Sequence, residues 1–219
     1  MSSILNDKLE KLKKEVNEFK KKNDEHKEKV KKITDETIKI IADIIKKGPD
    51  KSEIEVIERG YYDLVSSQYD ASSHMEFGNQ IQSNIRNLLT EIFGNIVGKH
   101  AQNNVGDVII EKNGKKAVVE VKSFIDRGES SPQGIKKLEE IKNEVEKDKK
   151  TKYVVYAHYH GCYKRYPEFH SQVIKNNWII LMSHQTLENG ELEYHPIFDI
   201  EKGYYSLLKL VEVIRKHID

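Results

Sequence analysis

An Asn-Gly dipeptide at residues 113 and 114 separates two runs of β-branched and other apolar residues within Gly106–Lys122. Both central residues of a tight two-residue turn need a positive φ, which asparagine and glycine adopt more readily than other residues, so the dipeptide predicts a β-hairpin. A two-residue loop also determines the register, because the residue numbers of every opposed pair then have the same sum. The expected pairs are Lys112 with Lys115, Ile110 with Ala117, Val108 with Val119, and Asp107 with Glu120.

The predicted register brings three charged side chains together on one face of the hairpin. Directly opposed residues have Cβ atoms roughly 4.5–5.5 Å apart, so the carboxylates of Asp107 and Glu120 would repel each other. Lys122 lies on the same face as Glu120, because side chains alternate along a strand. Burying such charges is costly unless they are paired or hold a cation. The pattern therefore predicts a divalent metal site, and the ordinary alternative is a solvated hairpin face.

An aspartate followed, after a spacer of twelve residues, by Glu-x-Lys on the next strand resembles the PD-(D/E)XK nuclease superfamily, which includes many type II restriction endonucleases. Here the motif consists of Gly106-Asp107 and Glu120-Val121-Lys122, with glycine where the family usually has proline. The resemblance implies an α/β fold with a restriction-endonuclease-like αβββαβ core, in which helices flank a mixed central sheet. It also implies Mg²⁺ as the cofactor, with the Val121 backbone carbonyl as a ligand beside the two carboxylates.

The residue types fit hydrolysis of a phosphodiester. Magnesium prefers oxygen ligands, which Asp107 and Glu120 supply, and a bound metal stabilises phosphate charge and activates water. Lys122 is placed to orient the attacking water and to stabilise charge on the phosphate. Family members often add a glutamate near the start of the first core helix, which favours Glu76 over Glu91. For either glutamate the ordinary alternative is a solvated carboxylate on the helix surface.

Hydrophobic periodicity predicts the order helix, three strands, helix, strand, strand, helix around this hairpin. This order agrees with the αβββαβ core that the resemblance implies, with the catalytic core at about 70–182 of a nuclease domain at 51–219. The expected elements besides the hairpin are a helix at 73–93, a strand at 96–99, a helix from Pro132, strands at 153–156 and 178–182, and a helix at 204–217.

The N-terminal residues 4–47 predict one long helix, within an arm of residues 1–50. Apolar residues recur at alternating spacings of four and three over about six heptads, with Asn23 on the same seam. The pattern fits a dimerising coiled coil, and it fits equally an arm that packs on its own domain or forms a hairpin with the next helix. Gly48-Pro49 ends the helix, and the next one is expected at 52–66, before a polar break at 66–73.

DNA contacts are expected from an aromatic and basic stretch at 158–166. Its Lys164 and Arg165 suit phosphates or guanine edges, and Gln133 and Lys136 lie near a helix N-terminus, which favours phosphate. The histidines and the cysteine at 158, 160 and 162 are zinc-ligand types, but their spacing is shorter than usual and no cysteine pair supports zinc. The ordinary alternative is a strand that continues through Tyr159 with surface aromatics.

Composition limits the functional classes. The net charge of +1 excludes strong bulk attraction to nucleic acid, so binding to DNA would depend on local basic patches. The single cysteine excludes an internal disulfide and fits a reducing cytoplasm. The sequence contains neither an apolar run of about eighteen residues nor an N-terminal signal-peptide core, so no membrane association is expected.

The expected function is that of a Mg²⁺-dependent endodeoxyribonuclease, a type II site-specific restriction endonuclease that acts on double-stranded DNA as a homodimer. One alternative is a Holliday-junction resolvase or another structure-specific nuclease of the same fold. Another, from a different class, is a non-catalytic DNA-binding or coiled-coil scaffold protein.

Overall fold

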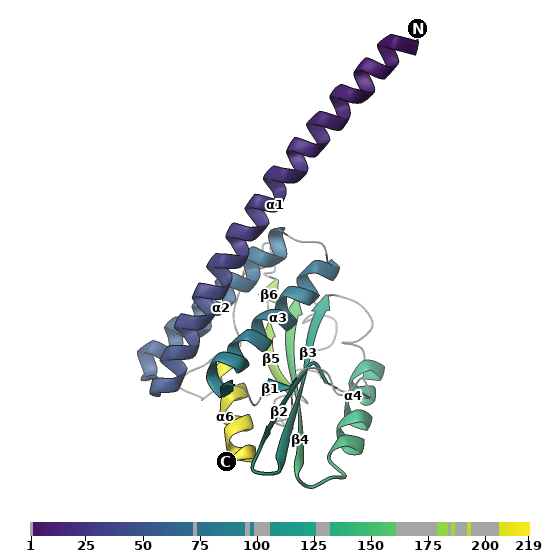
Figure 1. Cartoon of the computed structure of the whole chain (residues 1–219). Coiled ribbons are helices and arrows are strands. Elements are labelled where there is room, and N and C mark those ends of the chain that lie inside the picture. Colours follow the sequence, from purple (N-terminus) through teal and green to yellow (C-terminus); the bar gives the residue numbers. More distant parts are fainter. Residues whose placement is uncertain are drawn as a thin grey trace. The chain divides into compact units, whose positions relative to one another are not determined.

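A computed structural model of the chain describes most of the predicted elements (Figure 1). It divides into two units, Met1–Thr37 and Ile38–Asp219. The described residues are 2–71, 74–94, 97–98, 106–125, 132–160, 179–183, 185–186, 192–193 and 206–219.

The long N-terminal helix is confirmed as α1 (Ser2–Lys47), but the unit boundary lies within it. Its last turns belong to the second unit, because Ile38, Ile41 and Ile45 are buried in that unit's hydrophobic core. The division into an arm at 1–50 and a nuclease domain at 51–219 stays a prediction. The buried face is not the heptad seam, since Ile40 of the seam is 62% exposed. Packing on the domain is thus confirmed for these last turns, whereas dimerisation along the seam stays a prediction.

The second unit is an α/β structure built on a mixed five-stranded sheet with the order β1-β2-β3-β4-β5. The strands β1 (Val97–Gly98), β2 (Val108–Lys112) and β3 (Lys115–Ile125) are antiparallel neighbours. The strands β4 (Thr151–His160) and β5 (Ile179–Ser183) continue the sheet in parallel with β3. A separate pair consists of β6 (Gln185–Thr186) and β7 (Leu192–Glu193).

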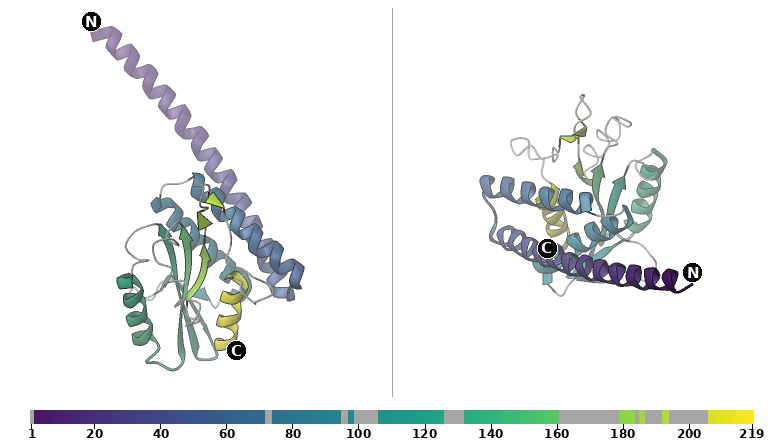
Figure 2. Two further views of the ribbon diagram at one scale, coloured as in Figure 1. Left: turned by 180° about the vertical axis from the view of Figure 1, so that it is seen from behind. Right: turned by 90° about the horizontal axis from the view of Figure 1, so that it is seen from above.

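Helices cover both faces of this sheet. The helices α3 (His74–Phe93) and α6 (Ser206–Ile218) pack on one face, and α4 (Pro132–Val145) packs on the other (Figures 1 and 2). The helix α2 (Lys51–Ala71) contacts α3 and α6. The predicted order of helices and strands is therefore confirmed from α3 to β5, whereas β6 and β7, which precede α6, were not predicted. None of the described helices has the length and apolar character needed to cross a membrane.

Alternation along the strands separates the sheet residues into two buried sets. One set joins α1, α2, α3 and α6 in the main core, and the other lies on the face that α4 covers. The first consists of Val108, Ile110, Ala117, Val119, Val121, Val154 and Tyr156. The second consists of Val118, Tyr153, Val155 and Ala157, and Leu138 of α4 is also buried.

The helix α2 differs from the prediction, because it continues to Ala71 through the polar stretch that was expected to break it. A tertiary contact explains the difference. Gln68 is buried, and its Oε1 accepts a hydrogen bond of 2.7 Å from Nδ2 of Asn84 in α3. A buried polar pair that is hydrogen-bonded stabilises the last turns of α2 in spite of their composition.

Candidate active site

The hairpin turn has the predicted conformation, with φ of 54° at Asn113 and 71° at Gly114. The register is also as predicted, since Lys112 pairs with Lys115 and Val108 pairs with Val119. Val108 and Val119 form the last pair of this ladder, so the ladder does not include the expected pair of Asp107 with Glu120. The residues beyond that pair make the inner end of the hairpin, where the charged side chains were expected to meet.

Asp107 is hydrogen-bonded to the two residues of β3 that flank Glu120. Its backbone N–H donates to the carbonyl of Val119 at 2.8 Å, and its Oδ2 accepts from the N–H of Val121 at 2.7 Å. The carboxylate of Asp107 therefore takes the acceptor position that a backbone carbonyl would occupy in a continued ladder. The residue is 9% exposed, so the two bonds hold a nearly buried carboxylate beside Glu120.

Gly106 allows the chain to enter this arrangement. Its φ is 85°, and a Cβ added there would lie 2.3 Å from Cγ1 of Val118. Proline has φ near −65°, so it is incompatible with this backbone conformation. Glycine, unlike proline, can therefore precede Asp107 in this backbone conformation.

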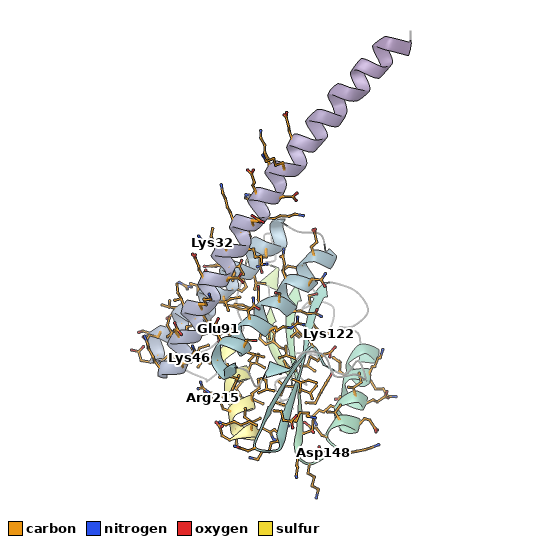
Figure 3. The ribbon with its side chains drawn as sticks, viewed as in Figure 1. Lys32, Lys46, Glu91, Lys122, Asp148 and Arg215 are labelled. Atoms are coloured by element: carbon orange, nitrogen blue, oxygen red, sulfur yellow. The ribbon has the colours of Figure 1, made fainter. Side chains whose placement is uncertain are left out.

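Lys122 forms an ion pair with Glu120 on the face that α4 covers. Nζ of Lys122 lies 2.8 Å from Oε1 of Glu120, and the two side chains are 25% and 16% exposed. Figure 3 shows Lys122 projecting from β3. Three of the predicted catalytic residues, Asp107, Glu120 and Lys122, are therefore brought together at one end of the hairpin.

Tyr153 of β4 lies on the same face of the sheet as Glu120. It pairs with Val118 in the parallel ladder, which places it on the same face as Glu120. Burial raises the pKa of Tyr153, and the negative charges of Glu120 and Asp107 raise it further. The sequence identified Tyr153 only as part of a buried strand, because no turn predicts the register of a parallel pair.

The donors at this site fit magnesium rather than a softer metal. In a β-strand, the N–H and C=O of one residue point to the same side, so the carbonyl of Val121 is expected on the side of β3 from which its N–H donates to Asp107. Two carboxylates and a carbonyl are hard oxygen ligands, which Mg²⁺ combines with water and phosphate oxygens. In the described part of the chain, no three His, Cys, Asp or Glu residues gather in one metal-binding group. A cation here would thus need ligands besides acidic side chains.

Glu76 lies in α3, two residues before the glycine that approaches the end of β3. Glu76 is exposed in the first turn of α3, and α3 packs on the opposite face of the sheet from Lys122. A Cβ at Gly78 would lie 2.9 Å from Oγ of Ser123, so this turn passes near the same end of β3. Glu91 is also exposed, near the other end of α3 (Figure 3). The role of either glutamate stays a prediction.

The predicted DNA contacts fall largely outside the described residues. Lys164 and Arg165 lie there, as does the side chain of Gln133, whose backbone is part of α4. Lys136 is exposed in α4. The strand β4 extends to His160, which confirms the strand alternative for the backbone of 158–160 and leaves zinc untested.

Comparison of the chain with protein-family models, with curated proteins and with solved structures found no match. The site itself combines the carboxylates of Asp107 and Glu120 with the ammonium group of Lys122.

Proposed function

We propose that the protein is a Mg²⁺-dependent endodeoxyribonuclease with a restriction-endonuclease-like αβββαβ core. One observation carries the proposal. Asp107 is hydrogen-bonded on both sides of Glu120, whose carboxylate lies 2.8 Å from the ammonium of Lys122. This arrangement supports the resemblance to the PD-(D/E)XK superfamily, because it gathers the motif residues on one side of the β2–β3 hairpin.

The order of elements around the site also supports the proposal. The segment from α3 through β1, β2, β3 and α4 to β4 has the order αβββαβ, and the motif residues lie at its central hairpin. In open α/β sheets, functional residues cluster at strand ends, where loops carry the chemistry and the sheet keeps it rigid. Asp107 lies in the loop that leads into β2, and Glu120 and Lys122 lie on β3 beside it.

Each charged residue has a distinct role in this proposal. Asp107, Glu120 and the carbonyl of Val121 hold Mg²⁺, which supplies charge neutralisation and an activated water. Lys122 turns from Glu120 toward the scissile phosphate, where its ammonium stabilises developing charge and orients the water. The hydrogen bond from Val121 to Asp107 keeps this carboxylate in place while Lys122 moves.

Double-stranded DNA is the proposed substrate, with cleavage at specific sites by a cytoplasmic homodimer in which each site cuts one strand. Lys164, Arg165, Gln133 and Lys136 are proposed to contact the DNA. The exposed seam residue Ile40 supports a dimer along α1, because an exposed isoleucine on a heptad seam is suited to burial against a second helix.

The test is Mg²⁺-dependent cleavage of plasmid and phage DNA, with a four-way DNA junction as a further substrate. Asp107→Asn and Glu120→Gln should abolish cleavage. Asparagine keeps a side-chain oxygen that accepts from the N–H of Val121, so the first variant removes charge with little change in structure. Thermal unfolding of each variant verifies that the fold is retained.

Glu111→Gln is the matched control, since Glu111 lies on the same face of the same hairpin at its exposed end. It should cut as the wild type does. Cutting of the junction alone would identify a structure-specific nuclease. DNA binding without cleavage of any substrate would favour the scaffold alternative, and equal cutting by all variants would exclude this site.

A further inference from the structure

Tyr153 lies at the candidate site without belonging to the motif. Its side chain is on the face of the sheet that carries Glu120 and Lys122, and the residue is 0% exposed. The residues on either side of Glu120 in β3 pair with Val154 and Tyr156, which belong to the opposite face. Tyr153 is therefore a buried phenol on the same face as the acidic pair.

The hydroxyl of Tyr153 has no hydrogen-bond partner among the residues that the structure describes. A buried hydroxyl without a partner destabilises a protein, and phenylalanine would fill the same volume without that cost. A hydroxyl at this position is therefore informative, because packing alone does not explain it. Hydrogen-bond acceptors near this hydroxyl could bind it.

Two carboxylates lie within electrostatic range of the hydroxyl. Glu120 has the larger effect of the two on the pKa of Tyr153, and Asp107 has the smaller one, after burial itself. A phenol donates one hydrogen bond, and an ionised carboxylate accepts through both oxygens. Glu120, which lies two residues after the ladder partner of Tyr153 and on the same face, is thus a suitable acceptor.

The backbone of Tyr153 is held by Glu146, the residue that follows the last residue of α4. Its N–H donates to Oε1 of Glu146 at 3.0 Å, and the carboxylate of Glu146 also pairs with Lys142 at 3.0 Å and with Lys152 at 3.2 Å. These contacts fix the start of β4, so the ring of Tyr153 projects from a rigid base. A rigid base is what a residue needs in order to orient a metal ligand.

We propose that Tyr153 is a positioning residue of the acidic site, whose hydroxyl donates a hydrogen bond to the carboxylate of Glu120 when that carboxylate binds a cation. Oε1 of Glu120 accepts from Lys122 in the arrangement described. Once Lys122 turns toward a phosphate, the phenol can hold Glu120 in its cation-binding orientation. The inference rests on the proposed function and adds to it a fourth residue, from a strand outside the motif.

The test compares Tyr153→Phe with wild type by calorimetric titration with MgCl₂, without nucleic acid. The dissociation constant for Mg²⁺ should rise roughly tenfold, as for other residues that orient metal ligands. Tyr156→Phe is the matched control, because Tyr156 is equally buried in the same strand but faces the main core. It should bind Mg²⁺ as the wild type does.

Urea unfolding without Mg²⁺ separates positioning from a structural role. Tyr153→Phe should be at least as stable as the wild type, because it removes an unpaired hydroxyl. Unchanged Mg²⁺ affinity, or clear destabilisation without Mg²⁺, would overturn the inference. Wild type that binds no Mg²⁺ would remove the metal site and the inference together. Wild type that binds Mg²⁺ but cuts no DNA would count against the nuclease function alone.

Discussion

The two ends of the β2–β3 hairpin carry the same kinds of charge on the same face, yet in different surroundings. At the outer end, Lys116 and Glu111 are directly opposed, with Nζ and Oε2 at 3.7 Å and side chains 43% and 61% exposed. At the inner end, Lys122 and Glu120 are 2.8 Å apart and only 25% and 16% exposed, and Asp107 lies beside them.

The comparison shows that the charged groups at the inner end are partly buried and hydrogen-bonded, whereas those at the outer end are solvated. An exposed pair such as that at the outer end contributes about 1 kcal/mol or less, and water solvates it when it opens. At the inner end, a third charge adds repulsion, and the backbone of β3 has to bind Asp107 to keep it there. Charges kept close at such a cost are better candidates for function than charges that merely alternate along a strand.

The largest expected effect is on catalysis. Lys122→Met should lower the rate of DNA cleavage by about 10²–10⁴-fold, because methionine has similar length but no charge to orient water or stabilise the phosphate. Lys116→Met removes the same charge from the outer end and should cut normally. Initial rates of plasmid nicking measure both. Similar losses in the two variants would mean that the lysines contribute only general attraction for DNA.

A large effect on stability is expected at the glycine of the inner end. Gly106→Ala should destabilise the protein by roughly 2–5 kcal/mol, because the added methyl would overlap Val118 and the positive φ is unfavourable for alanine. Gly114→Ala, at the outer end, has a positive φ but nothing within 4 Å, so about 1–2 kcal/mol is expected. Urea denaturation compares them, and equal losses would contradict the tight approach at Gly106.

A smaller effect concerns the affinity for Mg²⁺. The ammonium of Lys122 competes with a cation for Glu120, so Lys122→Met should bind Mg²⁺ more tightly, by up to about fivefold. Calorimetric titration without DNA measures the change, and Lys116→Met should show none. Weaker binding in Lys122→Met would mean that the lysine supports the metal site instead of competing for it.

The smallest expected effect extends the comparison to Glu146, a partly buried carboxylate with several partners. Burial tends to raise the pKa of Glu146, but hydrogen bonds from Tyr153, Lys142 and Lys152 outweigh burial, so the pKa is lowered. Folding should therefore gain stability above the unfolded value of 4.5 and lose it as the pH falls through the lower folded pKa. Glu146→Gln should remove this acid-dependent loss, which is about 1 kcal/mol or less because the group is partly exposed.

Urea unfolding at a series of acidic pH values measures the loss for Glu146→Gln and wild type. Glu144→Gln is the control, because Glu144 forms an exposed ion pair with Lys147 on the same helical segment. Its pH dependence should match that of the wild type. Identical curves for all three proteins would show that the contacts of Glu146 add no stability.

Local chemistry explains which parts of the fold were predictable. The conformation of Asn113 and Gly114 determines one antiparallel register, so the positions of Glu120 and Lys122 followed from the sequence. The hydrogen bond from Val121 to the side chain of Asp107 could not be predicted. Hydrophobic periodicity predicts which face of a strand is buried, but it does not predict where a ladder of hydrogen bonds ends. The end of α2 was missed for a related reason, since the partner of Gln68 is sixteen residues away.

The parallel strands were harder to predict than the hairpin. The strand that contains Tyr153 was expected, but its neighbour Val118 lies across a crossover that includes α4. No short motif determines the register of a parallel pair such as β3 and β4, because the register depends on how the connecting helix α4 packs on the sheet. Tyr153 could therefore be assigned to the site only from its place in the sheet.

The carboxylate of Glu58 in α2 has a consequence for biosynthesis. It is fully buried, and its Oε1 accepts hydrogen bonds from the N–H groups of Leu207 and Leu208, the first of them 149 residues later in the chain. A nascent chain that has not yet released α6 from the ribosome would hold this acid without these two backbone donors. The contact between α2 and α6 therefore forms only after translation is nearly complete, and a chain that terminates before Ser206 should be a substrate for cellular proteases.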